Sequence, residues 1–98
     1  MIDQVIDQEK VSAVRNYLQT EFPGCSIQEQ YDPERKALCF RVSDQGSTYL
    51  ASVTHEFLDK HEAPVIGSKL AKLTLAEHLR DLPSQPVIVT IGGLELEY

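Results

Sequence analysis

The middle of the chain alternates apolar and polar residues, which is the pattern of β-strands that cover a hydrophobic core with one face. We predict three strands in a meander, at about residues 25–31, 35–43 and 48–54. Asp-Pro-Glu at 32–34 and Asp-Gln-Gly-Ser at 44–47 separate them, and both segments are rich in turn-forming residues.

The apolar positions predict how the second and third strands pair. One register places every large apolar residue of the second strand opposite an apolar residue of the third. Its pairs are Val42 with Tyr49, Phe40 with Ala51, and Leu38 with Val53.

The first hairpin decides where the two cysteines lie. If Tyr31 is opposite Lys36, Ile27 faces Phe40 and Cys25 faces Val42. Cys39 then lies opposite Gln28, on the other side of the sheet, so the two thiols cannot meet. We expect both cysteines to be reduced, with Cys25 the more buried.

These registers sort the meander into two faces. The core face should carry the large apolar side chains: Ile27, Tyr31, Leu38, Phe40, Val42, Tyr49, Ala51 and Val53. The outer face should carry smaller or polar ones: Ser26, Gln28, Gln30, Ala37, Cys39, Arg41, Thr48, Leu50 and Ser52. The helices belong on the core face.

A helix precedes the strands. Val11, Val14, Leu18 and Phe22 recur at helical spacing and predict a helix over about 8–21. Asp7 is a good N-cap, Ile6 and Val11 stand at the staple positions, and Phe22-Pro23-Gly24 should end the helix.

Further helices follow the meander. Thr54 can cap a short helix from His55 to His61. After Pro64, residues 68–82 form either one helix capped by Ser68 or two helices with a break near Leu73, because Thr74-Leu75-Ala76-Glu77 is itself a capping box. Pro83 should end the last helix.

The C-terminal segment reads as strands at 86–91 and 94–98, with Gly92-Gly93 forming either a tight hairpin turn or a bulge in one long strand. An unpaired Val-Ile-Val-Thr-Ile strand is prone to aggregation. It must therefore pair within the sheet, be covered, or be buried against a second copy of the chain.

Together these elements predict a single two-layer α+β domain over residues 1–98. Its sheet is antiparallel, a meander with one or two C-terminal strands, and the helices pack on one face. The element order is α-β-β-β-α-α-β, with a further β if the C-terminal segment is a hairpin. A chain of 98 residues has room for one modest core.

Charge narrows the function classes. The chain has 15 acidic and 9 basic residues and a net charge of −6, so its average field repels nucleic acids and anionic lipids. No apolar run is long enough to span a bilayer, and MIDQVIDQEK lacks the pattern of a secretory signal. We expect an acidic, cytoplasmic protein with no membrane or cofactor.

Candidate chemistry is sparse. His55, Asp59 and Glu62 share one helix face, but the chain has no HExxH zinc motif, and a solvated polar face explains these residues better. Cys39 lies near Arg41 without a histidine beside it. We therefore predict no catalytic or metal-binding residue and favour a non-enzymatic protein.

The carboxylates and glycines of the sequence also give no sign of a catalytic or ligand-binding site. Asp59, Glu62, Glu77, Asp81, Glu95 and Glu97 are numerous, yet no pair has a context that would bury one of its members. Gly92-Gly93 lacks a phosphate-binding motif, and helix capping alone explains Gly67-Ser68-Lys69.

Two families have a similar order of elements. Helix, three strands and helix resembles double-stranded RNA-binding domains, and GSKLAK at 67–72 resembles their basic helix start. Only Lys69 and Lys72 supply charge there, and the outer face has no aromatic residue on which a base could stack. The acidic composition and element order are also similar to small secretion chaperones, which bind client polypeptides as homodimers.

These observations favour a protein-interaction or adaptor domain that self-associates through its sheet. Its expected partner is a second copy or another protein. The predicted contact surface is the flat outer face or the C-terminal strand. Its residues are Gln28, Cys39, Arg41, Leu50, Val87, Val89 and Ile91. A chaperone-like protein and an RNA-binding domain are the alternatives.

Overall fold

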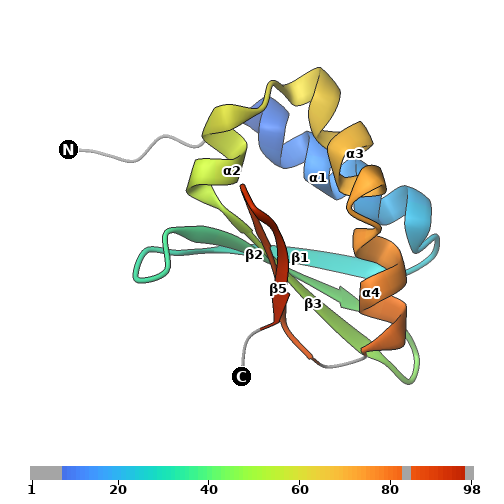
Figure 1. Ribbon diagram of the computed structural model, residues 1–98. Coiled ribbons are helices and arrows are strands. Elements are labelled where there is room, and N and C mark those ends of the chain that lie inside the picture. The colour runs from blue at the N-terminus through green and yellow to red at the C-terminus, as the bar shows by residue number, and fades with distance from the viewer. Residues whose placement is uncertain (1–7, 83–84, 97–98) are drawn as a thin grey trace.

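The computed structural model describes residues 8–82 and 85–96, and shows an α+β fold with helices on one face of a five-stranded sheet (Figure 1). The elements follow the chain in this order: α1 (Gln8–Glu21), β1 (Ser26–Asp32), β2 (Ala37–Ser43), β3 (Thr48–Thr54), α2 (His55–Lys60), α3 (Ala63–Lys72), α4 (Leu75–Asp81), β4 (Val87–Thr90) and β5 (Gly93–Leu96). The predicted class is confirmed, with one helix more than the predicted order.

Helix α1 has the predicted bounds, and its apolar residues are buried. It ends at Phe22-Pro23-Gly24, where Gly24 has a positive φ of 83° that suits a residue without Cβ. The amide of Phe22 still bonds to the carbonyl of Leu18. The predicted cap Asp7 and staple residue Ile6 lie outside the described residues.

Helix α2 forms where Thr54 predicted it. The hydroxyl of Thr54 accepts a hydrogen bond from the amide of Phe57 at 3.1 Å, which satisfies one of the free donors at the helix start. Phe57 and Leu58 point into the core.

Of the two alternatives left open over 68–82, the one with two helices and a break near Leu73 is confirmed, and the single helix is wrong. Helix α3 begins earlier than expected, at Ala63, with Pro64 in its first turn. Pro64 suits that place because the first amides of a helix have no partner within it. Ser68 and Lys69 therefore lie inside α3 and not at its start.

The start of α4 is held by a distant residue and not by the predicted capping box. Thr74 adopts a left-handed conformation with φ 55° and its side chain makes no cap bond. The hydroxyl of Tyr17, on α1, instead accepts the amide of Ala76 at 3.0 Å. This buried bond ties α4 to α1. Pro83, the predicted end of α4, lies outside the described residues.

The second hairpin has the predicted register, with Leu38 opposite Val53, Phe40 opposite Ala51, and Val42 opposite Tyr49. The first hairpin does not. Ile27 pairs with Val42 and Tyr31 with Leu38, so Cys39 faces Gln30 and not Gln28.

The turn explains this difference. The strands extend to Asp32 and Ala37, and the Asp32 carboxylate accepts the amides of Glu34 and Arg35. Lys36 takes a left-handed φ of 52°. Every residue keeps its predicted face, because the register moves by an even number of residues.

The C-terminal segment forms the hairpin and not the long bulged strand. Thr90 pairs with Gly93, and the Thr90 hydroxyl accepts the Gly92 amide and donates to the Gly93 carbonyl. Strand β4 also pairs with β3, in parallel. The sheet is therefore mixed, and the expectation of an antiparallel sheet is wrong. The strand with high aggregation potential is thus paired on both sides within the chain.

The core lies between the sheet and the helices. Leu38, Phe40, Val42, Ala51 and Val53 are buried as predicted, while Ile27, Tyr31 and Tyr49 pack against the core at its margin. Two residues assigned to the outer face, Ala37 and Ser52, are also buried.

Candidate functional site

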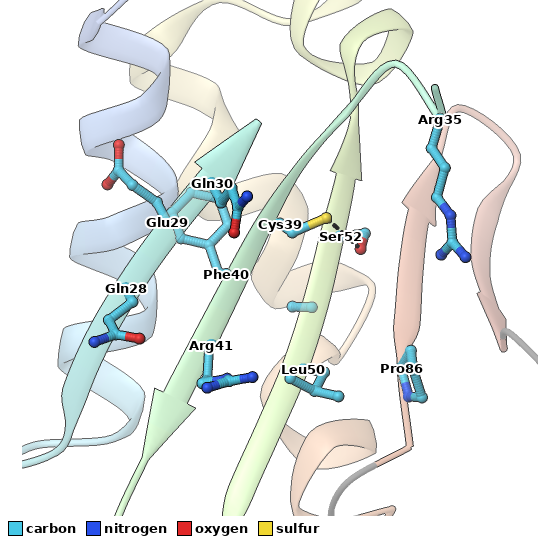
Figure 2. Close-up of a pocket in the computed structure, with 11 residues that line it drawn as sticks. Gln28, Glu29, Gln30, Arg35, Cys39, Phe40, Arg41, Leu50, Ser52 and Pro86 are labelled. Atoms are coloured by element: carbon cyan, nitrogen blue, oxygen red, sulfur yellow. Dashed lines mark hydrogen bonds between the residues drawn. The ribbon is translucent and has the colours of Figure 1, made fainter. Parts of the chain in front are cut away.

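The sheet face opposite the helices is hollowed into a groove of about 650 Å³, the outer groove, which we take as the candidate site (Figure 2). Its walls and floor come from β1, β2, β3, the β1–β2 turn and the residue before β4. It is lined by Gln28, Glu29, Gln30, Arg35, Cys39, Phe40, Arg41, Leu50, Ala51, Ser52 and Pro86. Because Phe40 and Ala51 are buried on the core face, their backbone is what borders the groove.

The registers arrange the outer face in rows that cross the strands. The central row runs through all five strands and consists of Gln30, Cys39, Ser52, Ile88 and Glu95. The next row consists of Gln28, Arg41 and Leu50. Small side chains thus form the floor of the groove, and longer amide and guanidinium groups stand around them.

The centre of the floor is a polar contact between neighbours. The hydroxyl of Ser52 donates a hydrogen bond to the sulfur of Cys39 at 3.3 Å, drawn as a dashed line in Figure 2. Ser52 is only 8% exposed, because Cys39 and Ile88 flank it in its row. The bond satisfies the Ser52 donor, which would otherwise be buried without a partner.

The charges around the groove leave one cation unbalanced. Glu29 is paired with Arg15 of α1, and Asp32 with Arg35 at 3.6 Å. Arg41 is exposed and makes no ion pair or hydrogen bond with any residue that the structure describes. A protein with a net charge of −6 therefore presents a positive centre in its groove.

The structure brings four of the predicted surface residues together. Gln28, Cys39, Arg41 and Leu50 all line the outer groove. Val87 and Val89 do not, since they are 0% exposed and face the helices from the interior strand β4. A partner of the folded chain cannot reach them. Ile91 is exposed at the β4–β5 turn, outside the groove.

Seven lining residues were absent from the predicted surface: Glu29, Gln30, Arg35, Phe40, Ala51, Ser52 and Pro86. Glu29, Phe40 and Ala51 stand at the alternate positions that face the core. Gln30 and Ser52 follow the same alternation as Gln28 and Leu50, so that pattern contained the signal for them. Arg35 and Pro86 belong to connections between strands. No periodicity places a turn residue over a particular part of a sheet.

The histidine segment does not form a metal site in the described part of the chain. His55 Nε2 lies 3.7 Å from Asp59 Oδ1, but no group of three or more potential ligands comes together there. His61 uses its Nδ1 in a contact of 2.8 Å with the carbonyl of Phe57, and its ring packs at a tilt against the Phe57 ring. This packing ends α2.

The remaining candidates have structural roles. Cys25 and Cys39 are both free and half-buried. Gly92 belongs to the β4–β5 turn and Gly93 begins β5. Among the groups that the structure describes, Tyr17 has a clearly displaced pKa, which burial raises above its ordinary value of 10.0. It lies on the core side, away from the groove.

No helix in the described ranges is both long and apolar enough to cross a bilayer. Lys69 and Lys72 are exposed in the last turn of α3, so they are not at a helix start as the RNA-binding resemblance requires. Comparison of the whole sequence and fold with protein-family models, curated proteins and solved structures finds no match.

Proposed function

We propose that this protein is a non-enzymatic interaction domain that binds an acidic segment of a partner polypeptide in the outer groove. The observation that carries the proposal is Arg41, an exposed guanidinium that pairs with none of the described residues and lies in a groove on the sheet face that the helices leave uncovered (Figure 1).

The charges support an acidic partner. Glu29, which lines the groove, and Asp32, in the adjoining β1–β2 connection, are already paired with arginines, so Arg41 remains to receive a carboxylate from a partner. An arginine can hold a carboxylate with two parallel hydrogen bonds, which gives direction as well as attraction.

The other lining residues support a polypeptide. Gln28 and Gln30 each carry an amide that can both donate and accept, and neither side chain is engaged with a described residue. Such groups match the backbone of an extended segment. Leu50 and the small floor residues leave room for its side chains.

A peptide titration tests the proposal. The probe is a fluorescently labelled octapeptide of alternating glutamate and valine, compared with the same peptide carrying lysine for glutamate. We expect the acidic peptide to bind more tightly, and Arg41→Glu to weaken that binding by about tenfold or more, because it turns an attraction into a repulsion.

Lys60→Glu is the matched control. It changes the net charge by the same amount but lies exposed on α2, on the helical side of the sheet. It should leave binding within about twofold, since exposed charges far from a site are screened by salt. Equal binding of both peptides, or equal losses in both variants, would contradict a groove specific for acidic segments.

A further inference from the structure

We infer that β1 is a self-association edge, at which a second copy of the chain adds its own β1 in antiparallel orientation and joins two sheets into one. This inference goes beyond the proposed function and does not depend on it.

The first observation is the open edge. Strand β1 stands at one end of the sheet and, among the described strands, pairs only with β2. It has seven residues, against four in β5 at the opposite edge. A long edge strand exposes a row of backbone donors and acceptors that another strand can satisfy.

The second observation is that β1 is self-complementary. A two-fold axis normal to the sheet keeps the core face of both copies on one side of the joined sheet. Each residue must then lie opposite a residue of the second copy whose side chain is on the same face. The axis must then pass through a residue that faces its own copy. The longest overlap has this axis at Glu29, the central residue of Ser26–Asp32.

That register matches side chains on both faces. Ile27 of each copy lies opposite Tyr31 of the other on the core face, and Gln28 lies opposite Gln30 on the outer face. An apolar–aromatic pair and an amide pair are favourable cross-strand neighbours. Shifting the axis to Gln28 or Gln30 shortens the overlap and places Glu29 opposite Ile27 or Tyr31.

The third observation concerns charge. Glu29 would face Glu29 of the second copy, a pairing that disfavours association when both carboxylates are bare. Here Arg15 of α1 pairs with Glu29 in each chain. The centre of the interface is then two carboxylates and two guanidiniums, which is neutral, and the strand contains no proline or lysine that would block strand addition.

Joining the sheets also extends the outer groove. Gln28 and Gln30 line the groove of their own chain and stand at the junction, so each groove continues onto the outer face of the second copy. The partner copy thereby adds to the site.

Charge reversal at the junction tests the inference by light scattering coupled to size exclusion. The native chain should show twice the chain mass, and Gln28→Lys/Gln30→Lys should show the mass of a single chain. The lysine variant brings four like charges together and should raise the dimer dissociation constant by about tenfold or more. Mixing it with Gln28→Glu/Gln30→Glu should restore a mixed dimer.

Glu95→Lys is the control, because it changes the net charge equally but lies exposed on β5, at the other edge. It should remain dimeric. Amide hydrogen exchange on the native chain provides a second measurement, in which protection of β1 amides should rise with protein concentration while that of β5 does not. A native chain of single mass at every concentration, or a lysine variant that dimerises like the native chain, overturns the inference whatever the peptide titration shows.

Discussion

The two faces of the sheet are built from the same strands, but one is buried under the helices and the other is left uncovered. Along β2, Leu38, Phe40 and Val42 point under the helices, while Cys39 and Arg41 alternate with them on the outer face. The first set is buried and forms the core. The second set lines a groove that no helix covers (Figures 1 and 2).

The core-face residues are those that folding requires, whereas folding places few demands on the outer-face residues. Burial of large apolar side chains explains the residues on the core face. It does not explain an unpaired arginine or the amides of Gln28 and Gln30, because solvated side chains contribute little to stability. The outer face is therefore the part of the chain where a function can reside without conflict with the fold.

Neighbouring substitutions on β2 should show the largest contrast. Phe40→Ala removes a ring that is 1% exposed and leaves a cavity, so it should lower the free energy of unfolding by about 3–5 kcal/mol. Arg41→Ala, one residue later, should change it by no more than about 0.5 kcal/mol. Urea unfolding followed by circular dichroism measures both, and similar losses would contradict the division into two faces.

Much of this division is predictable from the sequence, because alternation fixes the face of each strand residue whatever the register. Ile27 packs as well opposite Val42 as opposite Phe40, so the apolar pattern cannot choose between two registers that differ by an even number of residues. The choice is made in the turn, by the Asp32 carboxylate and the left-handed Lys36.

Other features depend on contacts between distant parts of the chain. Thr74 has the sequence of a cap, but Tyr17, which binds the Ala76 amide, is far away along α1. The parallel pairing of β3 with β4 likewise follows from how three helices return the chain to the sheet. For the candidate site, alternation predicts the strand residues, whereas Arg35 and Pro86 reach the groove from connections.

The covered face also holds a polar contact, and breaking it should have an intermediate effect. Tyr17→Phe removes the hydroxyl that accepts the Ala76 amide and leaves that amide buried without a partner. The free energy of unfolding should fall by about 1–3 kcal/mol. Thermal and urea unfolding measure the loss, and amide exchange at Ala76 should accelerate. Unchanged stability would mean that water replaces the hydroxyl and that this part of the covered face is open.

The same residue predicts a dependence on pH. Burial raises the folded-state pKa of Tyr17 above the unfolded value of 10.0. Below pH 10 both states keep the phenol proton, so its contribution to stability is fully present. Above pH 10 the unfolded state loses the proton first, and stability falls as the pH rises toward the folded-state pKa. The native chain should therefore lose stability more steeply than Tyr17→Phe in this range, and parallel pH profiles would argue against a buried phenol.

Among these buried residues, the smallest expected loss of stability is at Ser52, and it tests how little the outer face contributes to folding. Ser52 is buried at the centre of that face, and its hydroxyl donates to the weakly accepting sulfur of Cys39. Ser52→Ala removes both the donor and its need for a partner, so it should cost at most about 1 kcal/mol. Ser43→Ala, on the same face but half-exposed, should cost no more than about 0.5 kcal/mol. A loss for Ser52→Ala as large as that for Phe40→Ala would show that the floor of the groove carries the fold, and the outer face would then be no freer to evolve a binding role than the core.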